Sequence, residues 1–131
     1  MKKVLVIAYT DLSRDPRPLR QIKSLCKDYT VHTVGEAKSG LEGHFYQLRK
    51  VNFYYHIFRL LFLLTRRYES YLWDSFKKTL LGDIKKVRYD LIIVHEIRLV
   101  PFAKAIDPSV PVILDAHEYS PHNFNDNFMW K

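Results

Sequence analysis

The sequence is short of cysteine, glycine and long hydrophobic runs, and each shortage excludes a class of protein. A single cysteine, Cys26, among 131 residues excludes an intramolecular disulfide framework and favours a reducing, cytoplasmic setting. Four glycines, six prolines and no low-complexity tract exclude a collagen-like chain, a linker or a disordered tail. The apolar run at 3–9 is short and lacks an A-x-A-like site, which indicates a strand and not a signal peptide. The length suits one globular domain.

Charge is distributed unevenly along the chain. Lysine and arginine number 21 against 14 aspartates and glutamates, a formal net charge of +7. Residues 45–88 hold ten basic and three acidic side chains, so this one segment accounts for the whole excess. It is also rich in phenylalanine and tyrosine, which leaves three interpretations: a solvated charged face, an anionic membrane surface, or nucleic acid. Nucleic acid ranks last because no recognised binding motif accompanies the charge. The residues predicted to face a membrane are Arg59, Arg66, Arg67, Lys77 and Lys78.

Apolar runs alternate with helical periodicity, and this order predicts the fold class. Nearly continuous apolar runs of this kind are typical of strands buried on both faces of a parallel sheet. The predicted strands are 3–9, 29–34, 44–48, 90–95 and 110–117, and the predicted helices are 16–27, 53–64, 68–88 and 99–106. Asp15 is the expected N-cap of the first helix, with Pro16 in its first position. Together these elements predict an α/β domain with a doubly wound parallel sheet.

The predicted helix at 53–64 is apolar on almost every side. It is too short to cross a bilayer, which needs about 20 apolar residues. A half-exposed helix needs a wider polar face. This helix is therefore expected to be deeply packed in the domain, or covered by a partner or by lipid.

Polar side chains gather where three predicted strands end. Ligands of open α/β sheets bind beyond the carboxyl ends of the strands, so we expect a site there. His117 is a candidate acid or base that Glu118 orients, and ordinary strand-end polarity is the alternative. Arg17 either binds an anion at a helix N-terminus or pairs with Asp11 and Asp15. No metal site is predicted, and there is no Walker or G-x-G-x-x-G loop. The candidate binding residues are Asp15, Arg17, His95, Glu96, Asp115 and Tyr119, and the candidate catalytic residues are His117 and Glu118.

Three segments resemble the N-terminal half of a GT-B glycosyltransferase, and most of all the family 4 retaining enzymes. Residues 15–25 read DPRPLRQIKSL, like the family's arginine-bearing first helix, and YTVHTVG at 29–35 follows as a second strand. YDLIIVHE at 89–96 resembles the family's histidine-ended strand, and VPVILDAHEYSP at 110–121 resembles its D-x-H-E segment. The resemblance implies a Rossmann-like domain that binds the acceptor and faces a second, donor-binding domain.

The resemblance also implies roles for single residues. His117 matches the histidine that approaches the donor sugar, with Glu118 and Asp115 as its neighbours, while Arg17 matches the arginine near the cleft and His95 the histidine of the preceding strand. The reaction would transfer a sugar from a nucleotide-sugar to a glycan or lipid-linked acceptor with retention, and without a cofactor or an essential metal.

The expected organisation is a single Rossmann-like domain over residues 1–131 that is a fragment, because the family's E-x7-E signature of the donor-binding domain is missing. Alone, the chain is expected to be inactive and to need a C-terminal domain or separate subunit. It is expected in the cytoplasm, at the inner face of the membrane. The alternatives are a non-catalytic membrane- or partner-binding subunit of a split glycosyltransferase, and an unrelated phosphate- or nucleic-acid-binding α/β protein.

Overall fold

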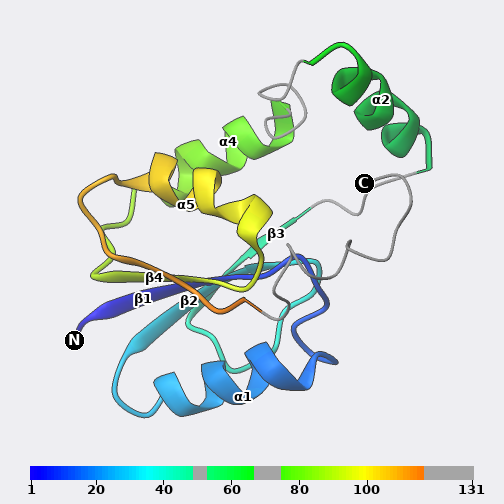
Figure 1. Ribbon diagram of the computed structural model, residues 1–131. Coiled ribbons are helices and arrows are strands. Elements are labelled where there is room, and N and C mark those ends of the chain that lie inside the picture. The colour runs from blue at the N-terminus through cyan, green and yellow to red at the C-terminus, as the bar shows by residue number, and fades with distance from the viewer. Residues whose placement is uncertain (49–52, 67–74, 117–131) are drawn as a thin grey trace.

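The computed structural model describes residues 1–48, 53–66 and 75–116. Within these ranges, strands and helices alternate along most of the chain (Figure 1). The strands are β1 (Lys3–Ile7), β2 (Thr30–Gly35), β3 (His44–Gln47), β4 (Leu91–Val94) and β5 (Val112–Leu114). The helices are α1 (Pro16–Leu25), α2 (Phe53–Leu64), α4 (Ser75–Ile84), the short 3-10 helix η1 (Ile97–Leu99) and α5 (Val100–Ile106).

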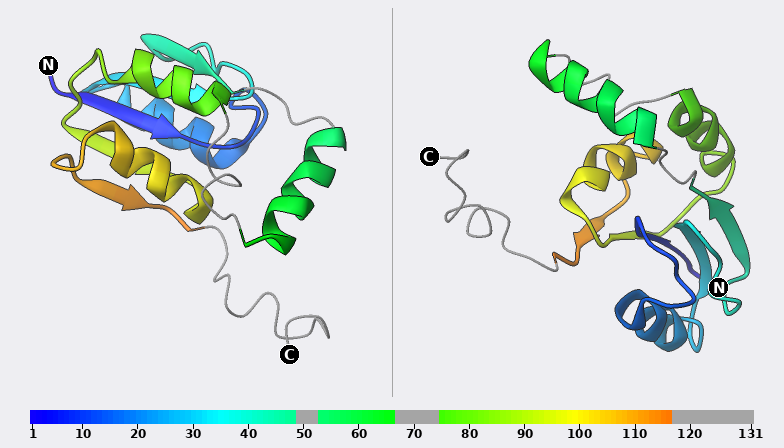
Figure 2. Two further views of the ribbon diagram at one scale, coloured as in Figure 1. Left: turned by 90° about the horizontal axis from the view of Figure 1, so that it is seen from above. Right: turned by 90° about the vertical axis from the view of Figure 1, so that its right-hand side faces the viewer.

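All five strands pair in parallel, in the order β3-β2-β1-β4-β5. The central strand β1 pairs with β2 on one side and with β4 on the other. The chain runs outward from β1 to β3, then crosses back over the sheet and runs outward on the other side through β4 and β5. Helix α1 covers one face, and α4 and α5 cover the other (Figures 1 and 2). The predicted α/β fold with a doubly wound, Rossmann-like parallel sheet is confirmed.

Burial on both faces explains why the strands are apolar at every position. Leu5, Ile7 and Ile92 face α4 and α5, while Val4 and Val6 face α1 and pack near Ile22. Four of the five residues of β1 are buried, as expected for a central strand.

Most predicted elements are a few residues shorter in the structure than in the sequence pattern, and hydrogen bonds explain two of the changed ends. The pattern predicts the last strand from residue 110, but Pro111 has no backbone N–H and Val110 N donates to Asp107 O in a turn. The strand therefore starts at Val112. Helix α4 ends at Ile84 and not at residue 88, because Lys86 N donates to Asp83 O in a tighter turn.

Helix α2 stands away from the sheet in every view (Figures 1 and 2). Its described side chains are between 53% and 75% exposed, although all of them are apolar or aromatic. They are Tyr54, Ile57, Phe58, Leu60, Leu61 and Leu64. The prediction that this helix packs deeply in the domain is wrong for these residues, and cover by a partner or by lipid stays a prediction. No helix among the described residues is long and apolar enough to span a membrane.

One buried polar group in the sheet leads to a stability prediction. Thr33 lies in β2 and is fully buried, and its Oγ1 atom has no hydrogen-bond partner among the described residues. Replacing it by the similarly shaped valine removes a hydroxyl that has lost its water without gaining a partner. Thr33→Val is expected to raise the free energy of unfolding by about 1 kcal/mol in urea titrations.

A matched control for this variant lies at the start of the same strand. The hydroxyl of Thr30 is part-exposed and donates to Met1 Sδ at 3.3 Å. Thr30→Val is therefore expected to change the unfolding free energy by no more than about 0.5 kcal/mol. A loss of stability in Thr33→Val would show that the hydroxyl has a partner.

Candidate functional site

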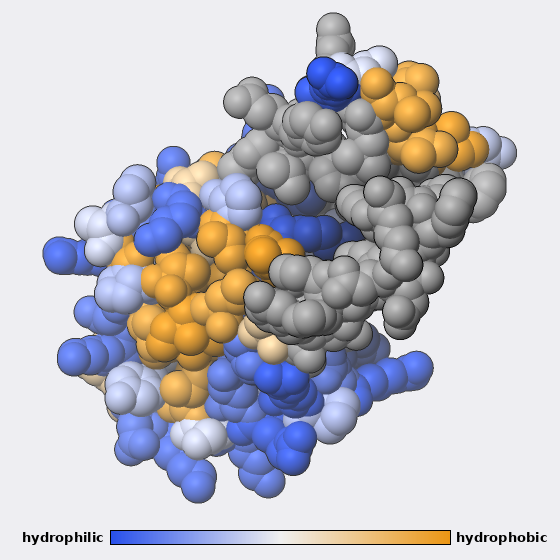
Figure 3. All heavy atoms as spheres, viewed as in Figure 1, coloured by the Kyte–Doolittle hydropathy of each residue, from blue (hydrophilic) through white to orange (hydrophobic). Residues whose placement is uncertain are grey.

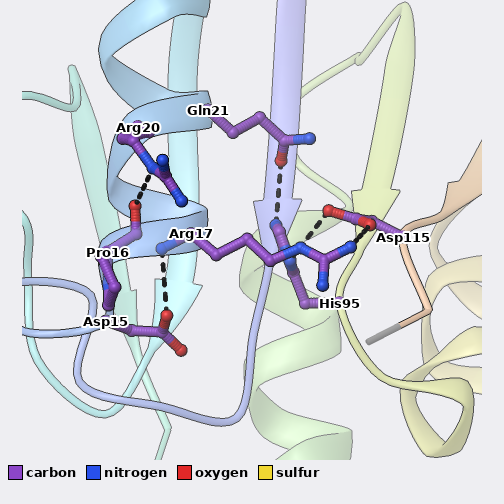
Figure 4. A network of polar contacts seen from close by, with 7 residues as sticks. All are labelled: Asp15, Pro16, Arg17, Arg20, Gln21, His95 and Asp115. Atoms are coloured by element: carbon purple, nitrogen blue, oxygen red, sulfur yellow. Dashed lines mark hydrogen bonds and ion pairs between the residues drawn. The ribbon is translucent and has the colours of Figure 1, made fainter. Parts of the chain in front are cut away.

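A network of four polar side chains lies at the carboxyl edge of the sheet (Figure 4). His95 directly follows β4, and Asp115 directly follows β5. The Nε2 atom of His95 is 2.9 Å from Gln21 Oε1, and its Nδ1 atom is 3.5 Å from Asp115 Oδ2. The other carboxylate oxygen of Asp115 accepts a 2.5 Å hydrogen bond from Arg17 Nη2. The network therefore joins α1 to the ends of β4 and β5.

The start of α1 explains how Arg17 and Gln21 come to the same place. Asp15 is the N-cap, and its Oδ1 atom accepts from the backbone N–H of Arg17 at 3.1 Å. Pro16 occupies the first turn, where its missing N–H costs nothing. Arg17 and Gln21 are one turn apart, so both side chains leave the helix on the same side. Arg20 takes another direction and donates from Nε to Pro16 O.

Burial in the network increases from the arginine to the histidine. The side chain of Arg17 is 42% exposed and that of Asp115 is 24% exposed, whereas His95 as a residue is only 3% exposed. Asp115 thus presents one oxygen to a partly exposed cation and the other to a buried imidazole. This fixes the orientation of its carboxylate on both sides, and it leaves Arg17 within reach of a ligand.

Glu96 and the residues around it form a second polar group at the same edge. Glu96 Oε2 accepts from Arg98 Nη2 at 2.5 Å. The guanidinium carbon of Arg98 is 5.8 Å from the ring centre of Tyr9, and Lys77 Nζ is 5.6 Å from the same ring centre. Two cations thus lie within cation–π range of one tyrosine. Lys77, predicted to face a membrane, thus lies over the ring of Tyr9, two residues after β1.

The structure brings some of the predicted site residues together and leaves others apart. Arg17 and His95 each contact Asp115, while Asp15 caps α1 and Glu96 pairs with Arg98. The sequence predicted Asp11 and Asp15 as the possible ion-pair partners of Arg17, but its partner in the structure is Asp115. Asp11 instead lies near Arg14, with 3.7 Å between Asp11 Oδ2 and Arg14 Nε. Arg66 and Lys78 are exposed, and Arg59 belongs to α2. His117, Glu118, Tyr119 and Arg67 lie outside the described residues.

Sequence reasoning missed Gln21, Tyr9 and Arg98. Gln21 is separated from His95 by 74 positions, and a single glutamine on an amphipathic helix carries no signal of a partner so far away. The four-residue spacing between Arg17 and Gln21 could have indicated the role of Gln21, because it places both side chains on the same side of the helix.

The described residues contain no group of three or more histidine, cysteine, aspartate or glutamate side chains that could hold a metal ion. No family model matches the chain, and searches of curated proteins and of solved structures found no match either. Function is therefore inferred from the polar network at the carboxyl edge of the sheet.

Proposed function

We propose that this chain is the acceptor-side domain of a GT-B glycosyltransferase similar to the family 4 retaining enzymes. One observation supports this most. Each of the three segments that carry the resemblance contributes to the network: Arg17 and Gln21 come from 15–25, His95 from 89–96 and Asp115 from 110–121. Segments far apart in the sequence thus meet at the edge of the sheet where ligands of α/β proteins bind.

The chemistry of the network suits a sugar ligand. Carboxylate and guanidinium groups with fixed orientations form hydrogen bonds to the hydroxyl groups of sugars, and Arg17 is exposed enough to do so. Asp115 stands two positions before His117 in the sequence, and the network fixes the orientation of Asp115. In the proposed enzyme, His117 contacts the reacting sugar, Glu118 orients it, and a second domain or subunit binds the nucleotide-sugar donor.

Binding of soluble glycosides tests this function in the chain as it exists. We expect octyl glucoside and octyl mannoside, below their micelle concentrations, to shift the ¹H–¹⁵N resonances of residues 95, 96, 115 and Arg17 Nε. UDP-glucose and GDP-mannose are expected to shift them less, because the donor binds to the other half. Arg17→Gln should weaken glycoside binding by about fivefold or more. Arg20→Gln is the matched control, because Arg20 bonds to the Pro16 carbonyl outside the network.

Two outcomes would contradict the proposal. The first is that none of the glycosides shifts these resonances. The second is that a random single-stranded oligonucleotide shifts them in a strongly salt-dependent way, which supports the phosphate- or nucleic-acid-binding alternative.

The exposed helix α2 favours a second activity, contact with the anionic inner face of a cytoplasmic membrane. Its described side chains are exposed and mostly apolar (Figure 3). Helix α2 also lies within the basic segment 45–88 of the sequence. Apolar side chains that enter the headgroup region and cations that meet anionic lipid act together, and each cation contributes about 1 kcal/mol. This contact serves a glycosyltransferase with a lipid-linked acceptor, and equally a non-catalytic, membrane-binding subunit.

Vesicle binding gives a quantitative prediction for this surface. Co-sedimentation with vesicles that contain anionic phosphatidylglycerol is expected to be strong at low salt, weak at high salt, and absent with pure phosphatidylcholine. Neutralising three basic residues next to α2 and in α4 should weaken binding by about 100-fold, at about 1 kcal/mol for each charge. These residues are Arg66, Arg67 and Lys78, each replaced by glutamine.

A control of equal charge separates local from overall attraction. Lys23, Lys27 and Lys104 are exposed on α1, just after α1 and on α5 respectively. Their replacement by glutamine changes the net charge equally and should leave most of the binding in place. Equal losses in the two triple variants would contradict a membrane surface at α2.

A further inference from the structure

Two histidines face each other across neighbouring strands, away from the network described above. The parallel register of β2 and β3 places His32 opposite His44, so both side chains leave the sheet on the same face. Their ring centres are 5.5 Å apart. His32 is partly buried at this position, and His44 is exposed to solvent.

The distance between the rings fits two imidazoles on one metal ion. Zinc binds imidazole nitrogen at about 2.0–2.1 Å with tetrahedral angles, which places the centres of two coordinating rings about 5 Å apart. The observed separation exceeds this by only a few tenths of an ångström, within reach of a small rotation of the exposed His44 side chain.

The contacts of His32 show which nitrogen is available. Its Nδ1 atom is 3.0 Å from Tyr89 Oη, and the Oη atoms of Tyr89 and Tyr46 are 3.3 Å apart. Its Cδ2 atom lies on the side of Gly43, just before β3, at 4.0 Å from where a Cβ would stand. Since Nε2 is bonded to Cδ2 in the ring, the Nε2 edge of His32 lies toward β3, the strand that carries His44.

We propose that His32 and His44 form a binding site for a divalent transition-metal ion, Zn²⁺ or Cu²⁺, at the β3 edge of the sheet. Two imidazoles and water complete its coordination, because the described residues supply no third ligand. Tyr89 acts on the other nitrogen of His32, as the outer partners of metal-binding histidines do. The site is independent of the proposed transferase function, and it differs from the prediction of no metal site.

Two electrostatic features support a neutral, coordinating imidazole. Burial, then the neighbouring His44 and Lys3, lower the pKa of His32 below its ordinary value, so the ring keeps a lone pair at pH 7. Burial and the hydroxyl of Tyr46 raise the pKa of Tyr89, so Tyr89 stays a neutral phenol. An ion bound to both histidines would link the edge strand β3 to β2 and stabilise their pairing.

Calorimetry with Zn²⁺ alone, and electron paramagnetic resonance with Cu²⁺ alone, test the site in the full chain. We expect one Zn²⁺ per chain, and a Cu²⁺ spectrum with coupling to two imidazole nitrogens. His44→Ala lowers the affinity by about tenfold or more and leaves coupling to one nitrogen. Because His44 is exposed, this variant is expected to fold normally.

Three of the four other histidines supply the controls. His56→Ala and the double variant His117→Ala/His122→Ala are expected to bind Zn²⁺ as tightly as the parent chain does. The proposal is overturned if His44→Ala binds Zn²⁺ unchanged, or if the His117/His122 variant loses the ion. Tyr89→Phe gives a second readout, because loss of the partner of Nδ1 should weaken binding several-fold without changing the number of coupled nitrogens.

Discussion

Replacing His95 by alanine is expected to lower the free energy of unfolding by about 3 kcal/mol. The imidazole is nearly completely buried, between Gln21 and Asp115. Its removal leaves the amide oxygen of Gln21 and one oxygen of Asp115 without this partner, and it opens a space the size of the ring. Urea unfolding followed by circular dichroism measures the change.

The neighbouring residue provides the control for this experiment. Glu96 is also polar and also follows β4, but its ion pair with Arg98 is partly exposed. Glu96→Ala is therefore expected to cost no more than about 1 kcal/mol. Equal costs for His95→Ala and Glu96→Ala would mean that the network contributes nothing to stability beyond an ordinary surface pair.

Gly35→Ala is expected to lower the free energy of unfolding by about 2 kcal/mol, because the end of β2 has no room for a side chain. A Cβ at Gly35 would stand 2.8 Å from Leu12 Cγ and 3.1 Å from Thr10 O. Leu12 is fully buried, so it has little freedom to move aside. Thermal and urea unfolding of the parent chain and of Gly35→Ala measure the difference in unfolding free energy.

A double-mutant cycle and a second glycine test the stated cause. Leu12→Ala removes the atoms that a methyl group at Gly35 meets, so the double variant should cost about 1 kcal/mol less than the sum of the single costs. At Gly82, inside α4, a Cβ would meet no described atom within 4 Å. Gly82→Ala should thus stabilise the chain by about 0.5–1 kcal/mol. Additive costs at Gly35 and Leu12 would contradict the steric explanation.

Much of the fold is predictable because both faces of the sheet are covered. Continuous apolar runs mark β1 and β4, and the N-cap Asp15 followed by Pro16 marks the first residue of α1. The end of α4 and the start of β5 are less predictable. They depend on turn hydrogen bonds at Lys86 and Val110, and no periodicity records such bonds.

The sequence predicts where the candidate site lies, but it does not predict which of its side chains contact each other. Topology alone puts Arg17, His95 and Asp115 at the carboxyl edge, since parallel strands end together. Which of them meet depends on side-chain directions and on Gln21, which the sequence does not distinguish from other surface glutamines. The same holds for α2, because a run of apolar residues has the same pattern whether the domain or something outside it provides the cover.

The central position of β1 has a consequence for how the chain folds. Lys3 pairs with Thr30, which is only 27 positions later in the sequence. In contrast, the backbone N–H of Lys3 donates to Asp90 Oδ2 across 87 positions, and Val4 pairs with Leu91 at the same separation. Closing this long loop is entropically costly, and parallel pairings of high sequence separation form slowly. During synthesis, the backbone N–H and C=O groups along one edge of β1 thus stay unpaired with β4 until β4 has left the ribosome. We expect the chain to be most prone to aggregation during this interval, because unpaired strand edges and apolar surface are then exposed.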